Sequence, residues 1–179
     1  MFLRTFFPDE YYNSTYDIDY DKLYASGMRG IIFDIDNTLV PHGAPPDARS
    51  KELFSKLNDL GFKCILLSNN REGRVKSFAK GVKYTDYIYR GGKPSRKGYL
   101  RSMDMMGTDR KNTVFIGDQL FTDVWGAKRT GIKSILVHQI DKKEEIQIVL
   151  KRILENIVLH FYFKEQDSAV QKAEPEQRR

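Results

Sequence analysis

Short apolar runs alternate along this chain with longer segments in which apolar residues recur every three to four positions. Short runs are typical of strands, and a 3.6-residue recurrence is typical of helices that bury one face. Strands that alternate with helices predict a three-layer, Rossmann-like α/β fold, in which helices flank a parallel sheet. The predicted strands are residues 30–33, 62–67, 87–89, 113–116 and 134–137, and the predicted helices are residues 46–60, 72–80, 95–106, 119–130 and 143–163.

The two ends of the chain differ from its centre. Eight aromatic residues crowd into the segment before Gly30, which suits either an arm wrapped over the core or contact with a membrane interface. The predicted helix 143–163 carries a wide apolar stripe suited to packing on a sheet. After it the chain is polar and buries too little apolar area to order itself. We therefore divide the chain into an N-terminal aromatic arm (1–28), an α/β domain (29–163) and a flexible polar tail (164–179).

Composition excludes several classes of protein. The single cysteine, Cys64, rules out an internal disulfide framework and a cysteine-based zinc cluster. It also makes a reducing, cytoplasmic setting the default expectation. Charged residues interrupt the most apolar stretch, so no membrane-spanning helix is expected.

The net charge of +6 is unevenly distributed. Residues 71–111 hold twelve Lys and Arg but four Asp and Glu, which gives this segment a charge of +8. A basic surface suits an anionic partner such as a phosphate ester, an anionic lipid or a nucleic acid. A merely solvated basic face is the alternative that charge alone leaves open.

Polar residues stand where the predicted strands end. In a parallel sheet the carboxyl ends of the strands meet at one edge, and ligands bind there. These residues are Asp34 and Asp36 after the first strand, Ser68 and Asn69 after the second, Lys93 after the third, and Asp118 and Asp123 after the fourth.

This set of side chains suits phosphate chemistry. Carboxylate oxygens without a Cys or His cluster favour Mg²⁺, which also accepts phosphate oxygens as ligands. An ionised aspartate can attack phosphorus to form an aspartyl-phosphate, and a cation with a lysine would neutralise the transferred group. A second carboxyl group nearby could protonate the leaving oxygen if its pKa is raised. A second Asp-x-Asp sequence, Asp17 to Asp19, follows no apolar strand and is interpreted as a turn or helix cap.

The motifs Asp34-Ile35-Asp36-Asn37-Thr38-Leu39, Ser68-Asn69, Lys93-Pro94 and Gly117-Asp118 with Asp123 resemble the four ordered motifs of the haloacid-dehalogenase superfamily. The resemblance implies that Asp34 is the nucleophile and a metal ligand. It implies that Asp36 is the acid/base and binds metal through its backbone carbonyl. Ser68, Asn69 and Lys93 would hold the phosphoryl group, and Asp118 and Asp123 would complete the Mg²⁺ site.

Finer features are similar to the small bacterial phosphatidylglycerophosphate phosphatases. They are Tyr16-Asp17-Ile18-Asp19 with Leu23 and Gly27, the run Asp36-Asn37-Thr38-Leu39-Val40-Pro41, and the run Gly117-Asp118-Gln119-Leu120-Phe121-Thr122-Asp123. This resemblance implies a phosphomonoester on an anionic lipid headgroup as substrate, and a cytoplasmic enzyme that contacts the inner membrane face peripherally. Only 31 residues separate Asp36 from Ser68, which leaves no room for a cap domain and predicts an open site. A phosphatase for nucleic-acid ends or phosphoproteins, and a non-catalytic phosphate-binding module, remain as alternatives.

Overall fold

A computed structural model describes residues 2–83, 85–141 and 146–173. It contains one six-stranded sheet in which every pairing is parallel, with the order β1-β6-β5-β2-β3-β4. The five predicted strands are all present, and the parallel α/β fold is confirmed. The strands are β1 (Glu10–Tyr12), β2 (Gly30–Phe33), β3 (Lys63–Leu67), β4 (Thr85–Ile88), β5 (Thr113–Gly117) and β6 (Lys133–Val137).

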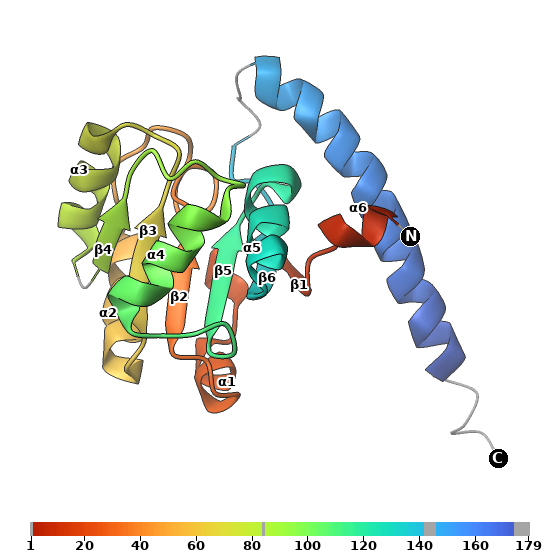
Figure 1. Cartoon of the computed structure of the whole chain (residues 1–179), viewed down its shortest axis with the longest axis horizontal. Coiled ribbons are helices and arrows are strands. Elements are labelled where there is room, and N and C mark those ends of the chain that lie inside the picture. The colour runs from red at the N-terminus through yellow and green to blue at the C-terminus, as the bar shows by residue number, and fades with distance from the viewer. Residues whose placement is uncertain (1, 84, 142–145, 174–179) are drawn as a thin grey trace.

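Helices cover both faces of the sheet (Figure 1). Successive residues of a strand point to opposite faces, so β2 contributes to two cores. Ile31 and Phe33 pack with Phe54, whereas Ile32 packs with Tyr99. One face is covered by α1 (Tyr20–Ala25), α2 (Ala48–Leu60) and α3 (Glu72–Val82), and the other by α4 (Arg96–Met106) and α5 (Trp125–Thr130).

Helix boundaries follow the capping residues of the sequence. The Asp47 side chain accepts a hydrogen bond from Ser50 N–H at the start of α2, and Gly61 ends the helix with a φ of 92°. Asp19 caps α1 by accepting from Lys22 N–H, which confirms that the second Asp-x-Asp sequence is a helix cap. The predicted helix 119–130 is a π-helical turn, η3 (Leu120–Val124), that continues into α5.

The N-terminal arm packs on the core. It contains two 3₁₀ turns, η1 (Phe2–Phe6) and η2 (Thr15–Asp17), together with β1. Phe6 and Phe7 are buried against Leu136 and Val158, and β1 pairs with β6 as an edge strand. Of the two expectations for the aromatic arm, this arrangement supports packing over the core.

The C-terminal helix α6 (Ile146–Ala173) extends ten residues beyond the predicted helix. Polarity after Lys164 does not prevent helix formation, because Lys, Glu, Gln and Ala are good helix formers. The helix also lies differently from the prediction. It contacts η1 and η3 beyond the β1–β6 edge and leans away from the sheet (Figure 1), because α1–α5 already cover both faces. Val158 and Tyr162 are buried, whereas Ile153, Leu154, Ile157 and Phe161 stay 41–55% exposed.

No cap domain interrupts the sheet in the part of the chain that the structure describes. Between β2 and β3, where every residue is described, α2 is the only helix, and the isolated bridge between Asp36 and Val40 adds the only pairing. Within the described residues, none of the helices combines the length and the apolar character needed to cross a bilayer.

We expect Phe7→Ala to lower the free energy of unfolding by about 3 kcal/mol, because truncation of a buried aromatic ring removes apolar contacts and leaves a cavity. Tyr89→Ala, at a ring that is 41% exposed, is the matched control and should change it little. Urea unfolding followed by circular dichroism measures both. Equal midpoints for Phe7→Ala and the wild type would contradict the role of the arm in the core.

Candidate active site

The site lies at the carboxyl ends of β2 and β5, where the order of the strands in the sheet changes direction relative to the sequence. The chain continues from β2 to β3 on one side, while β5 pairs with β2 on the other. Loops after two such strands diverge and leave a crevice at their carboxyl ends. Asp34 follows β2 and Asp118 follows β5, and Asp34 N–H donates to the carbonyl of Ile116 at 3.0 Å. The sheet register therefore places the two carboxylates side by side.

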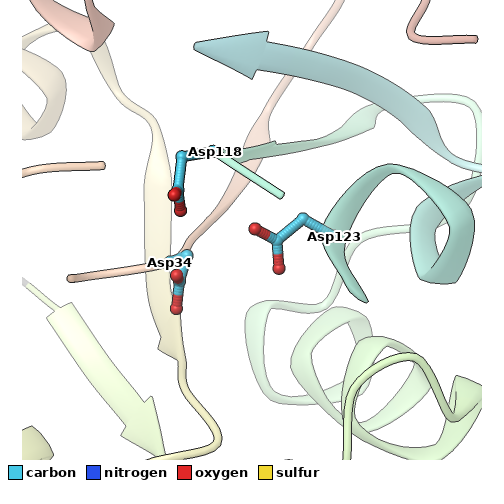
Figure 2. Close-up of side chains that lie close together, drawn as sticks. All are labelled: Asp34, Asp118 and Asp123. Atoms are coloured by element: carbon cyan, nitrogen blue, oxygen red, sulfur yellow. The ribbon is translucent and has the colours of Figure 1, made fainter. Parts of the chain in front are cut away.

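Three aspartates gather at this edge, as Figure 2 shows. Carboxylate oxygens of Asp34, Asp118 and Asp123 all lie within 4.8 Å of one another, and all three residues are buried. Asp123 comes from η3, whose turn brings its side chain back under Gly117. A Cβ at position 117 would lie 2.7 Å from Cγ of Asp123, so glycine there permits the close approach.

Lys93 is the positive charge of this cluster. Its Nζ lies 2.7 Å from Oδ1 of Asp34 and 2.8 Å from Oδ1 of Asp123, and its side chain is 3% exposed. The two carboxylates raise the pKa of Lys93 against the opposing effect of burial, so it is an ammonium ion. The structure thus brings together four of the predicted site residues, Asp34, Lys93, Asp118 and Asp123.

The pKa of Asp34 is raised above its ordinary value. Burial is the largest cause, and the charges of Asp123 and Asp36 add to it, while Lys93 opposes the shift. Burial and the neighbouring carboxylates thus disfavour the ionised form of Asp34. A divalent cation at the cluster would favour it.

The donor set fits such a cation. All three groups offer hard oxygen ligands, which Mg²⁺ and similar ions prefer. Thr38 donates to Oδ1 of Asp118 at 3.1 Å, which orients that carboxylate, and Gln119 N–H donates to Oδ2 of Asp123 at 3.1 Å. Contacts of this outer kind fix the orientation of metal ligands. The cluster can therefore bind a divalent metal ion.

Asp36 does not join the cluster through its carboxylate. Arg74 donates to Oδ1 at 2.8 Å, Gly43 N–H donates to the same oxygen at 2.8 Å, and the amide of Asn70 donates to Oδ2 at 2.9 Å. Burial raises the pKa of Asp36, but these hydrogen bonds and the charge of Arg74 outweigh it and lower the pKa. The predicted acid needs a raised pKa, so the state described here differs from that expectation.

The turn after Asp36 has a local cause. Asn37 adopts a left-handed φ of 64°, which asparagine tolerates better than most residues, and its N–H donates to the Val40 carbonyl at 2.8 Å. The Tyr16 hydroxyl of the N-terminal arm donates to the carbonyl of Leu39 at 2.7 Å. The arm therefore supports the turn that carries the first motif.

Ser68 and Asn69 lie at the end of β3, as predicted. Ser68 is 4% exposed, and its hydroxyl accepts from Asn70 N–H at 3.1 Å. The side chain of Asn69 accepts from Lys93 N–H at 2.8 Å and donates to the Lys93 carbonyl at 3.1 Å. Asn69 thus holds the backbone of Lys93 in this structure, and its contact with phosphate stays a prediction.

The sequence did not indicate the contacts that two residues make in the site. Thr38 belongs to the first motif, but nothing in the spacing indicates that it orients Asp118, 80 residues away. Arg74 stands out only as one of many basic residues, and its pairing with Asp36 depends on how α3 meets the turn after β2. No local pattern reports contacts of this kind.

Comparisons with known proteins relate the chain to phosphatases. A family model described as HAD-hydrolase-like matches residues 90–154. The chain is 35% identical over 160 residues to the probable phosphatase YqeG of Bacillus subtilis, covering 89% of this chain and 92% of that protein. It is 25% identical over 149 residues to the chloroplastic/mitochondrial phosphatidylglycerophosphate phosphatase 1 of Arabidopsis thaliana, covering 74% of this chain but only 40% of that protein.

Solved structures support the fold. The crystal structure of a HAD phosphatase from Thermococcus onnurineus superposes with a TM-score of 0.51 at 16% identity, covering 66% of this chain and 90% of the other. At that identity the likeness concerns the fold alone. It matches the parallel sheet and flanking helices described above.

We expect Arg74→Met to raise the pKa of Asp36, because burial remains while the guanidinium that opposes it is lost. The free energy of unfolding changes with pH in a direction that the lowered pKa of Asp36 determines. In the wild type the contribution of Asp36 is present above its unfolded pKa of about 3.9 and is lost as the pH falls through the lower folded pKa. In the variant this contribution shrinks or reverses.

A carboxyl ¹³C NMR titration of the metal-free protein measures the pKa directly. Arg71→Met, at an exposed arginine three residues away, is the matched control and should leave the Asp36 titration unchanged. A wild-type titration curve in Arg74→Met would refute the assignment.

Proposed function

The chain belongs to the haloacid-dehalogenase-like hydrolases and is a phosphatase, and we propose that it hydrolyses phosphomonoesters through an aspartyl-phosphate on Asp34. The observation that carries this proposal is the position of Asp34, buried at the end of β2 beside Lys93 and two further carboxylates. An oxygen of Asp34 attacks phosphorus, and the bond from phosphorus to the ester oxygen breaks. Lys93 neutralises charge on the transferred group.

Asp36 is proposed as the acid/base of both steps. It gives its proton to the leaving oxygen, then takes a proton from the water that attacks the phosphoryl group and frees Asp34. Asp36 must leave Arg74 to do so, since the guanidinium favours the ionised carboxylate. An anionic phosphate ester entering the site would compete with Asp36 for Arg74. Loss of the guanidinium contact would raise the pKa of Asp36, and the acid role needs that raised pKa.

We propose Mg²⁺ as the cation. Asp34 and Asp118 would hold it through their carboxylates, Asp36 through its backbone carbonyl, and Asp123 directly or through its support of Lys93. When bound, the ion would supply positive charge that lets a carboxylate approach a phosphate dianion. Ser68, placed at the end of β3, would donate to a phosphoryl oxygen.

The proposed substrate is phosphatidylglycerophosphate, whose phosphomonoester sits on an anionic lipid headgroup. Three observations support it. Among the described residues no cap domain closes over the site, so a bulky ester has access. Arg71, Arg90 and Arg96 are exposed just beyond the ends of β3 and β4 and can attract an anion. One relative carries that activity in its name.

Asp34→Asn should lower kcat on every phosphomonoester at least about a thousandfold, because it removes the nucleophile. Asp17→Asn changes the exposed first carboxylate of the other Asp-x-Asp sequence and should leave kcat unchanged. The assay compares phosphate release from phosphatidylglycerophosphate in mixed micelles, a 5′-phosphorylated oligonucleotide and a phosphopeptide. We expect at least a tenfold higher kcat/KM for the lipid. A preference for the oligonucleotide or the peptide would replace the lipid, and turnover by Asp34→Asn would overturn the mechanism.

We further propose that α6 contacts an anionic bilayer from the cytoplasmic side. The N-terminal aromatic rings Phe6 and Phe7 are buried, so they are not available for this contact. On α6, Ile153, Leu154, Ile157 and Phe161 recur on one exposed face, next to Lys164. A lipid substrate requires the enzyme to reach the bilayer surface, and the net charge of +6 favours an anionic one.

The double variant Ile157→Gln and Phe161→Gln should weaken binding to phosphatidylglycerol vesicles at least about tenfold, because two exposed apolar contacts are lost. Leu100→Gln with Tyr89→Gln changes two similarly exposed residues, one on α4 and one just after β4, and serves as the control. Co-sedimentation at low and high salt measures binding, and salt should weaken it. Unchanged vesicle binding by the α6 variant would refute membrane contact through this face. If the wild type is a dimer and the α6 variant a monomer, the face binds a second copy of the chain instead.

A further inference from the structure

Glu155 is a buried carboxylate that the reaction described above does not use. It lies on α6, is 3% exposed, and comes from a helix outside the sheet core. Burial of an acidic side chain is costly unless hydrogen bonds compensate it. Its Oε1 accepts from Leu120 N–H at 2.8 Å and from Phe121 N–H at 3.4 Å. Its position therefore has a specific cause in the η3 turn.

These two N–H groups belong to the loop that carries the metal cluster. They open η3, where backbone donors have no partner earlier in the helix. Asp118 lies two residues before Leu120, and Asp123 lies three residues after it. A side chain that holds residues 120 and 121 thus sets the spacing between the two carboxylates that face Asp34.

The loop is held from two sides. From within, Asp123 accepts from Gln119 N–H through Oδ2 while its Oδ1 contacts Lys93. From outside, Glu155 holds the next two residues from 35 positions further along the chain. A cavity of about 90 Å³ bordered by both Asp118 and Glu155 shows how near α6 comes to the cluster.

We propose that Glu155 is a positioning residue for the divalent-cation site, acting through the backbone of residues 120 and 121. The inference rests on the proposed metal site. Groups that orient metal ligands are typically worth a ten- to hundredfold change in metal affinity. The negative charge of Glu155 also favours a nearby cation, so the removal of the carboxylate acts twice in the same direction. α6 is then part of the active-site framework in addition to its packing on η1.

The test measures Mg²⁺ binding directly, by calorimetric titration of the full chain, together with the Mg²⁺ dependence of phosphatase activity. Glu155→Ala should weaken Mg²⁺ binding at least about tenfold. Glu155→Gln keeps an acceptor oxygen but loses the charge, so it should be intermediate. KM for the phosphoester, measured at saturating Mg²⁺, should change less than twofold in Glu155→Gln. If Glu155→Ala does not fold, the glutamine variant decides.

Two control variants separate positioning from stability. Glu165→Gln changes an exposed glutamate on the same helix, paired with Arg4, and should leave Mg²⁺ affinity unchanged. Val158→Ala loosens the docking of α6 without touching the carboxylate, and should lower the unfolding temperature but not Mg²⁺ affinity. A loss in Val158→Ala equal to that in Glu155→Gln would mean that Glu155 only docks the helix. A wild-type protein that binds no Mg²⁺ refutes the proposed metal site, whereas wild-type affinity in both Glu155 variants refutes this inference alone.

Discussion

The ion cluster around Lys93 is the constraint on which the rest of the structure depends. Two buried carboxylates share one buried ammonium ion, and a third carboxylate lies within 4.8 Å of them. Such groups are tolerated away from water only when each finds its partner at short distance. Asp34, Lys93 and Asp118 follow three different strands, so the charges compensate one another only when those strands pair in the observed order. Formation of the sheet and formation of the site are therefore one requirement.

Asp36 stands two residues from Asp34 but in a different electrostatic environment. Burial and neighbouring carboxylates raise the pKa of Asp34, whereas Arg74 and two neutral donors lower that of Asp36. Environments that separate two carboxyl groups in this way are how one fold assigns them different tasks. In the proposed mechanism, a cation at the cluster would favour ionised Asp34, and an anion at Arg74 would release Asp36. The pKa of Asp34 would then lie below that of Asp36 only when both ions are bound.

Elements whose cause is local could be predicted from the sequence. Five short apolar runs indicated five strands, and three of these runs lead directly into Asp34, Ser68 or Gly117. The pattern of the strand and the polar residue at its end lie within a few positions of each other, so both can be recognised locally. The strand β1 was missed because Glu10–Tyr12 is three residues long and depends on its pairing with β6. The predicted helix 143–163 ends ten residues before α6 does. The polar residues after Lys164 were interpreted as disordered, although their helix propensity is high.

Contacts between side chains that are distant in the sequence could not be predicted, because no local pattern indicates them. Thr38 reaches Asp118 over 80 residues, and Glu155 reaches Leu120 over 35. A threonine in a loop and a glutamate in a helix are ordinary in their local surroundings. The pairing of β2 with β5 brings Thr38 to Asp118. The packing of η3 between β6 and α6 brings Leu120 to Glu155, and apolar side chains of the N-terminal arm join that packing.

The shape of α6 follows from what the sheet leaves unoccupied. Both sheet faces are already covered by α1–α5, so a helix with apolar residues on two sides finds room only beyond the β1–β6 edge. There one side meets η1 and η3, where Glu155 and Val158 are buried, and Ile153 and Ile157 on the other side stay in water. Because these side chains stay exposed, they add no apolar burial to the stability of the domain. An external apolar environment would make their exposure favourable, and the bilayer contact proposed above would provide one.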